Sequence, residues 1–99
     1  MSRWQAPMVP TKMQMTSMLE SEGLEAQEET LSPGTHVQDT RHPFDEVRMV
    51  VEGQMFLDIS GNKMLLRAGD RVVIPANTRH SKQVDGTEPC CCLYAMKAF

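Results

Sequence analysis

Hydrophobic residues follow two different periods along this chain, and the change falls near Leu24. Before Leu24, three apolar residues stand at positions i, i+3 and i+4, which form one face of a helix: Met15, Met18 and Leu19. Thr11 followed three residues later by Gln14 forms a capping box, and Gly23 suits the left-handed end of a helix. The pattern predicts one short helix over residues 12–22, too short to be stable unless it packs on the rest of the protein.

After Leu24 the apolar residues occur in short runs that are separated by Gly, Pro, Asn and Asp. These runs predict eight strands, over residues 24–31, 35–41, 46–52, 54–60, 63–67, 71–74, 79–84 and 90–97. Residues 54–67 are interpreted as a hairpin that turns at Gly61-Asn62. So many short strands favour an antiparallel barrel or sandwich, because closure of a sheet removes its exposed edges.

Side chains alternate between the two faces of a strand, so the strands predict which residues share a face. The strand before the His42-Pro43 turn is expected to carry four polar residues on one face: His36, Gln38, Thr40 and His42. The next strand has two opposite rows, one with Glu46, Arg48 and Val50, the other with Val47, Met49 and Val51. In the last strand one face holds Cys90, Cys92, Tyr94 and Met96.

The chain has three histidines, and their neighbours suggest metal chemistry. Glu46 follows a turn at residues 43–45, so its carboxylate can return close to His42. Imidazole and carboxylate ligands suit a borderline divalent metal, and a small protein ligand set leaves coordination positions open. The spacing by itself leaves two alternatives, because a histidine in a strand is more often only hydrogen-bonded in place.

Two stretches of the chain resemble the paired motifs of the cupin family. In residues 34–53 the first motif, G-(x)5-H-x-H-(x)3-E-(x)6-G, is matched by Gly34, His42, Glu46 and Gly53, and Thr40 stands where the family has its first histidine. In residues 69–84 the second motif, G-(x)5-P-x-G-(x)2-H-(x)3-N, is matched by Gly69, Pro75 and His80, while Asn77 and Val84 replace its second glycine and its asparagine. The 15 residues between the motifs are a typical length for the family.

The resemblance implies an all-β fold, the cupin double-stranded β-helix or jelly-roll-type barrel, with a short N-terminal helix. We expect an N-terminal arm over residues 1–10 and a single cupin domain over residues 11–99. The resemblance also implies one divalent metal ion (Fe, Mn, Ni or Zn) on three ligands: His42, Glu46 and His80.

Cupins include dioxygenases, isomerases and lyases, so the resemblance implies a metalloenzyme that acts on a small oxygen-rich molecule, without naming a catalytic residue. The alternative is a non-enzymatic module that binds a small ligand, with or without metal, and Thr40 in place of one family ligand favours it. Candidates for binding the small molecule are His36, Gln38, Thr40 and Arg48. Arg48 is expected either to bind a substrate carboxylate through two hydrogen bonds or to neutralise Glu46 or Glu52. Asn77 is expected to adopt the left-handed conformation that the family's glycine permits.

Composition limits the partners. A length of 99 residues leaves room for one domain. The net charge of −3 argues against a nucleic-acid partner. No apolar run approaches the roughly 18 residues of a membrane span, and the first residues do not resemble a signal peptide.

The remaining features concern cysteines, acidic residues and exposed apolar residues. The three cysteines are consecutive, residues 90–92, which indicates reduced thiols in a cytoplasmic protein; Cys90 and Cys92 are interpreted as core residues, with a ligand role as the alternative. One solvated acidic face is expected to hold Glu20, Glu22, Glu25, Glu28 and Glu29. Trp4 and the methionine-rich helix provide apolar surface, which favours a homodimer.

Overall fold

Thr11 begins the helix that the capping box predicted. The computed structural model describes residues 1, 3–5 and 8–97, and helix α1 runs over Lys12–Ser21. The Oγ1 atom of Thr11 accepts a hydrogen bond from the backbone N–H of Gln14 at 3.1 Å, and the Oε1 atom of Gln14 accepts one from the N–H of Thr11 at 2.8 Å. Gly23 ends the helix with a φ of +80°. The helix was therefore predicted to within one residue.

All eight predicted strands are present. They are β1 (Gln27–Leu31), β2 (His36–Thr40), β3 (Asp45–Glu52), β4 (Gln54–Ile59), β5 (Asn62–Arg67), β6 (Arg71–Ile74), β7 (His80–Gln83) and β8 (Cys90–Lys97). Among the predicted strand ends, the largest error is at the start of β1, which lies at Gln27 and not at residue 24. The β4–β5 turn consists of Ser60 and Gly61, with φ of +51° and +89°, because Ile59 pairs with Asn62. The hairpin was predicted correctly, and its turn lies one residue earlier than expected.

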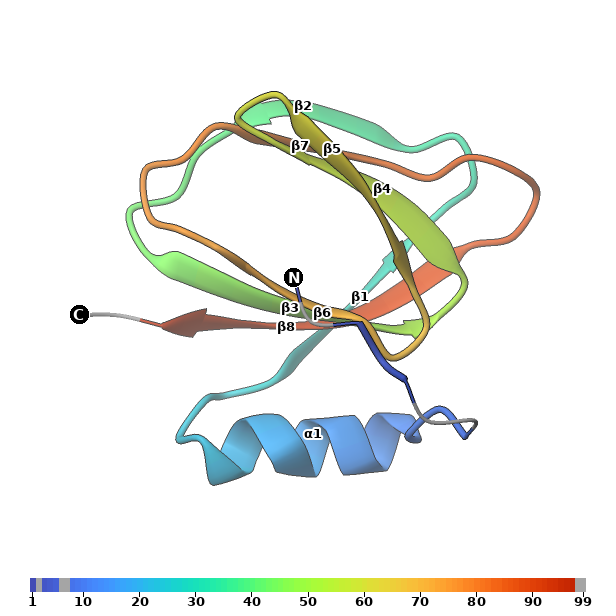
Figure 1. Ribbon diagram of the computed structural model, residues 1–99, viewed down its shortest axis with the longest axis vertical. Helices are drawn as coiled ribbons and strands as arrows, with labels where there is room; N and C mark the ends of the chain where they lie inside the picture. Colours follow the sequence, from blue (N-terminus) through green and yellow to red (C-terminus); the bar gives the residue numbers. More distant parts are fainter. Residues whose placement is uncertain (2, 6–7, 98–99) are drawn as a thin grey trace.

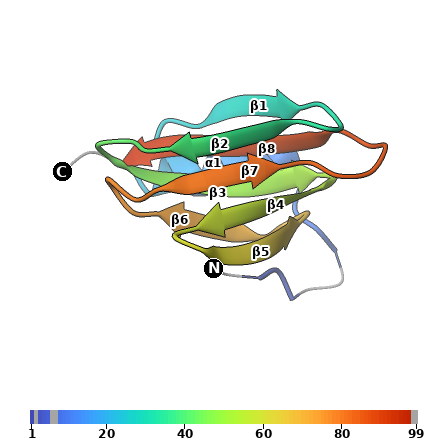
Figure 2. The same cartoon turned by 90° about the horizontal axis from the view of Figure 1, so that it is seen from above.

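The strands form two four-stranded antiparallel sheets, with the orders β1-β8-β3-β6 and β2-β7-β4-β5. Figure 1 shows the two sheets facing each other, with α1 against the outer side of the first sheet. Figure 2 shows their strands lying side by side along one direction. This arrangement is the all-β jelly-roll barrel with one short helix that the sequence predicted.

Apolar side chains fill two layers. Between the sheets lie Leu31, Val50, Met55, Leu57, Leu66, Val72, Ile74, Val84, Cys90 and Cys92. Under the helix, Met15 and Leu19 pack on residues of β3 and β8: Val47, Met49 and Leu93. The two rows of β3 are thereby confirmed, since Val50 faces the barrel while Val47 and Met49 face the helix. Burial of each large side chain contributes about 1.5–3 kcal/mol, which is what holds so short a helix in place.

Strand β2 does not alternate as predicted. Asp39 has a φ of +47°, and the pairing with β7 shifts register between Val37 and Thr40. Val37 pairs with Lys82 and Thr40 pairs with His80, so two residues only three apart face the inward row of β7. A bulge inserts one extra residue and moves later side chains to the other face. The prediction that residues 36, 38, 40 and 42 share one face was therefore wrong.

The arm expected over residues 1–10 contacts the β5–β6 turn. The backbone N–H of Trp4 donates to Oδ1 of Asp70 at 3.0 Å, and the indole N–H donates to the carbonyl of Met8 at 2.7 Å. Gly69 has a φ of +92°, and a Cβ atom there would lie 2.7 Å from the Cβ of Trp4, so this motif glycine makes room for the arm. Parts of the expected arm (residues 2 and 6–7) and domain (residues 98–99) lie outside the described residues.

None of the helices in the described ranges is long and apolar enough to cross a membrane.

Candidate metal centre

Two loops bring the three predicted metal ligands together at one end of the barrel. His42 lies between β2 and β3, Glu46 is the second residue of β3, and His80 is the first residue of β7. The N–H of Asn77 donates to the carbonyl of His42 at 2.7 Å, and the N–H of Ala76 donates to Oδ1 of Asp45 at 2.7 Å. Asn77 has a φ of +57°, the left-handed conformation expected from the sequence. These two bonds join the loop before Glu46 to the loop before His80.

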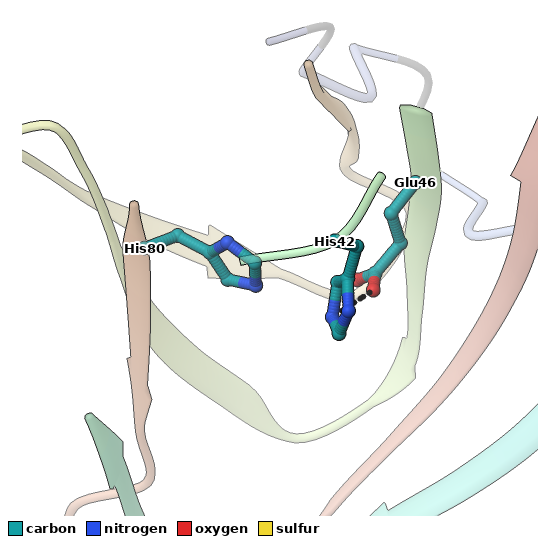
Figure 3. Close-up of side chains that lie close together, drawn as sticks. All are labelled: His42, Glu46 and His80. Carbon is teal, nitrogen blue, oxygen red and sulfur yellow. Dashed lines mark ion pairs between the residues drawn. The ribbon is translucent and has the colours of Figure 1, made fainter. Parts of the chain in front are cut away.

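The candidate ligand atoms converge. The Nε2 atom of His42 lies 3.6 Å from Oε1 of Glu46, and the ring centroids of His42 and His80 are 5.3 Å apart (Figure 3). One ligand atom from each of the three residues lies within 4.8 Å of the other two. Two ligands of one ion with bonds of about 2.1 Å lie at most about 4.2 Å apart. Small side-chain rotations therefore suffice to place all three around one ion.

One ring nitrogen of His80 has no hydrogen-bond partner among the described residues. Its Nδ1 lies 3.1 Å from the carbonyl oxygen of Thr78, which can only accept, so Nδ1 carries the ring proton. The Nε2 atom is then a free lone pair, and it is buried without a hydrogen-bond partner. A buried polar atom left unpaired costs about 1–3 kcal/mol, and metal-bound histidines usually donate their other N–H to a carbonyl. The Nε2 atom of His80 is therefore available to bind a metal. Together with His42 and Glu46 it forms a set of ligands that fits a divalent ion.

Aromatic stacking orients the other histidine. The ring of His42 lies parallel to that of Phe44, with centroids 5.0 Å apart and an interplanar angle of 5°. His42 remains 30% exposed, whereas Glu46 and His80 are almost fully buried, at 4% and 2%. The cluster is therefore reached from solvent on the side of His42.

Arg48 pairs with Glu46 inside the barrel. Its Nε atom donates to Oε2 of Glu46 at 2.8 Å, and its Nη1 atom donates to Oε1 of Glu29 at 2.9 Å. Arg48 is 1% exposed, and its guanidinium lies 5.2 Å from the centre of the Tyr94 ring. Burial alone would lower the pKa of Arg48, but the carboxylate of Glu46, helped by Glu29, raises it, so the guanidinium stays charged. Of the roles expected for Arg48, neutralising Glu46 is the one in place.

The half-buried Glu29 and the buried Lys82 are charges facing the barrel that the sequence analysis missed. Glu29 was assigned to the solvated acidic face, but its carboxylate accepts from Arg48 and lies 3.6 Å from Nζ of Lys82. Desolvation raises the pKa of Glu29, but the positive charges of Arg48 and Lys82 lower it by more. The pKa of Glu29 is therefore below its usual value. Strand alternation could have predicted this orientation, because Glu29 lies two residues from the core residue Leu31 and therefore shares its face of β1. Lys82 likewise lies two residues from His80.

The candidates for binding a small molecule are divided by the β2 bulge. Thr40 pairs with His80 across the strands, and its hydroxyl donates to the carbonyl of Gln38 at 3.4 Å. His36 and Gln38 are exposed, and His36 pairs with Gln83 on the outer row of β7. The structure therefore brings Thr40 and Arg48 to the candidate metal centre and places His36 and Gln38 elsewhere.

Comparison with known proteins agrees with this architecture. Residues 27–96 match the family described as cupin domain. This is well over half of the chain, which therefore belongs to the cupin family. No curated protein matches the sequence.

Solved structures show the same fold at low sequence identity. The DMSP lyase DddQ from Ruegeria pomeroyi superposes with a TM-score of 0.70 at 21% identity, over 76% of this chain and 38% of the lyase chain. The cupin domain of an XRE family transcriptional regulator from Enterobacter cloacae gives 0.70 at 18% identity, over 81% and 86%. A protein from Thermotoga maritima described as a predicted oxalate decarboxylase gives 0.69 at 17% identity, over 85% and 74%. The chain thus covers less than half of the lyase, and these likenesses establish the fold alone.

Proposed function

We propose that this protein is a small metal-binding cupin that holds one divalent ion, of Fe, Mn, Ni or Zn, on His42, Glu46 and His80. The observation that carries the proposal is the buried Nε2 of His80, which lies without a partner beside an imidazole and a carboxylate. Two histidines and one carboxylate leave coordination positions open for a small molecule.

We further propose that the protein is an enzyme acting on a small oxygen-rich molecule, in a dioxygenase-, isomerase- or lyase-like reaction. A bound divalent ion supplies a Lewis acid, and iron would also allow dioxygen to react. Neighbouring residues of the chain orient the three candidate ligands. Thr78 fixes the ring of His80 with its proton on Nδ1, Phe44 orients His42, and Arg48 holds the carboxylate of Glu46 in an ion pair. The solved structures named as a lyase and as an oxalate decarboxylase are consistent with such a reaction on this fold.

Elemental analysis tests the metal first. Protein purified without an affinity tag, and again after incubation with each of the four ions, should contain one ion per chain. His42→Ala, Glu46→Ala and His80→Ala should each abolish stoichiometric binding. His36→Ala is the matched control, because His36 is exposed and lies on the outer row of β2, and it should bind as the wild type does.

Thermal unfolding gives a second readout. An ion that binds only the folded state raises the melting temperature by mass action. A chelator should therefore lower the melting temperature of the wild type and of His36→Ala, and leave the three other alanine variants unchanged. A wild type that stays metal-free with all four ions would overturn the metalloenzyme proposal.

A second candidate function is a non-enzymatic module that binds a small ligand. Thr40 favours it, because a hydroxyl is a poor ligand for these metals, and this one already donates to a backbone carbonyl. The cupin domain in the transcriptional regulator from Enterobacter cloacae also supports it, since this chain covers 86% of that structure. Elemental analysis distinguishes the metalloenzyme from a metal-free module, because only the metalloenzyme requires a bound ion.

We infer that the protein resides in the cytoplasm, and that its partner is a small molecule and not nucleic acid or membrane. The three cysteines are free thiols, as expected in a reducing compartment, and the net charge is −3. Fractionation of cells that express the chain would test the compartment.

A further inference from the structure

A second cluster of potential ligand atoms lies inside the barrel and consists of sulfur. Cys90 and Cys92 point to the same face of β8, and their Sγ atoms lie 3.6 Å apart. The Sδ atom of Met55, on β4 of the opposite sheet, lies 3.7 Å from Sγ of Cys92. All three residues are at most 1% exposed. We call these residues the sulfur cluster.

The sulfur cluster is separate from the candidate metal centre. Along the β3–β8 pair, Cys92 is opposite Val50, whereas Glu46 is opposite Met96. Four residues of a strand span about 13 Å. No side chain of the His42, Glu46 and His80 group can therefore bind an ion that the sulfur atoms hold.

We propose that Cys90, Cys92 and Met55 form a binding site for a soft monovalent metal ion, Cu(I) or the chemically similar Ag(I). Thiolate and thioether sulfur are the ligands that soft ions prefer over imidazole and carboxylate. With metal–sulfur bonds of about 2.3 Å, two sulfurs of a three-coordinate ion lie about 4 Å apart. The separations of 3.6 and 3.7 Å differ from that value by only a few tenths of an ångström, so the Sγ atom of Cys92 is already spaced from both other sulfurs as such an ion requires.

Binding requires no oxidant or reductant when the ion is supplied as Cu(I) or Ag(I). The S–H bonds of Cys90 and Cys92 break, two metal–sulfur bonds form, and two protons leave to solvent. The thioether of Met55 donates a lone pair and releases no proton. The resulting group of one cation and two thiolates carries a charge of −1.

The surroundings favour that charge. A hydrogen bond from Cys90, helped by the charge of Arg48, lowers the pKa of Cys92 to about 7 despite its burial. The same hydrogen bond, with burial, raises the pKa of Cys90. Arg48 lies next to Cys92 on the inward face of the β3–β8 pair and remains charged.

Cys91 provides a matched control, because it alternates to the other face of β8. Its Sγ lies 3.6 Å from Oε1 of the exposed residue Glu28, outside the barrel. If the cysteines served only as small core residues, neither Cys90 nor Cys92 would differ from Cys91 in metal binding. The proposal requires them to differ.

The test is a titration of the fully reduced, metal-stripped protein with Ag(I), which does not change oxidation state, and with Cu(I) under nitrogen against a competing chelator. Samples are equilibrated overnight, because entry to a buried site requires local opening of the barrel. Wild type, Cys91→Ser and His80→Ala should each bind one ion. Cys90→Ala and Cys92→Ala should lose it, and Met55→Leu should bind at least about tenfold more weakly, since even an outer-shell change costs that much.

A thermal scan shows whether the folded protein holds the ion. Capture by the native sulfur cluster raises the melting temperature, whereas capture by unfolded cysteines lowers it. Absence of binding to the wild type, equal binding to Cys92→Ala, loss on Cys91→Ser, or a lower melting temperature with the ion would each overturn the proposal. If one alanine variant does not fold, as judged by circular dichroism, the other alanine variant and Met55→Leu decide the result.

Discussion

The backbone N–H of Asn77 donates a 2.7 Å hydrogen bond to the carbonyl oxygen of His42. Asn77 lies three residues after β6 ends at Ile74, and His42 lies three residues before β3 begins at Asp45. The bond therefore connects the two halves of the candidate metal centre. Asn77 itself adopts a φ of +57°. Together with the bond from the N–H of Ala76 to Asp45, the bond from Asn77 joins the loop before His80 to the loop before Glu46.

Substitutions at Asn77 should follow backbone strain. Asn77→Gly should be neutral or mildly stabilising, because glycine adopts this conformation without cost. Asn77→Val should reduce the free energy of unfolding by about 1 kcal/mol or more, since a β-branched residue is strained at positive φ. Urea denaturation measures both. If Asn77→Gly destabilised as much as Asn77→Val, the conformational argument would fail.

Thr40→His should strengthen metal binding. Thr40 pairs with His80 in the register of β2 and β7, so an imidazole there can reach the same ion as a fourth ligand. Competition against a chelator, with the metal that the wild type binds, measures the change in affinity. Gln38→His is the matched control, because Gln38 is exposed on the other side of the bulge. Equal affinities in the two variants would contradict the expected role of position 40.

Arg48→Met should be strongly destabilising, by about 3 kcal/mol or more, because it leaves the carboxylates of Glu46 and Glu29 without their buried partner. The loss should be smaller when Glu29→Gln is already present, and a double-mutant cycle in urea measures this coupling. Arg71→Met serves as comparison. Arg71 pairs with Glu22 at the surface, where an ion pair contributes about 0–1 kcal/mol. Similar losses at positions 48 and 71 would argue against a buried ion-pair network.

The stability of the protein should fall in acid partly through Glu29. Its pKa is lowered in the folded state, so the unfolded chain takes up a proton first as the pH decreases. The stabilisation is therefore present above the unfolded pKa of about 4.3 and is lost as the pH falls through the folded value. Free energies of unfolding measured from about pH 6 to about pH 3 should decline less steeply in Glu29→Gln than in the wild type. Parallel curves would show that Glu29 does not contribute.

The homodimer stays a prediction, and the exposed residues suggest where it forms. Met8 and Met13 are 81% and 79% exposed, and Trp4 and Met18 are each 37% exposed; these residues lie on α1 and on the arm before it. Light scattering at micromolar concentration should give about twice the monomer mass of 11.2 kDa. Met13→Glu should shift the mass toward the monomer, and Lys63→Glu, on the outer face of the other sheet, should not. A wild-type mass near 11.2 kDa would refute the homodimer.

Patterns along the chain were enough to predict the helix, the eight strands and the three candidate metal ligands. Local rules suffice for the elements, because caps, turns and alternation depend on residues a few positions apart. The capping box at Thr11 and Gln14 is one example, and the left-handed conformation of Asn77 is another. The spacing of the cupin motifs named His42, Glu46 and His80, which the folded chain brings within 4.8 Å of one another.

Side-chain orientation could not be predicted at two kinds of position: where a strand departs from strict alternation, and where charged residues far apart in the chain form ion pairs. The bulge at Asp39 leaves His36 and Gln38 exposed, and strict alternation could not anticipate it because a bulge depends on the partner strand. Glu29 points inward because Arg48, nineteen residues later, provides a buried charge to meet it. The approach of Met55 to Cys92 likewise requires two sheets to face each other. Such contacts join residues far apart in the chain, so no pattern within one segment contains them.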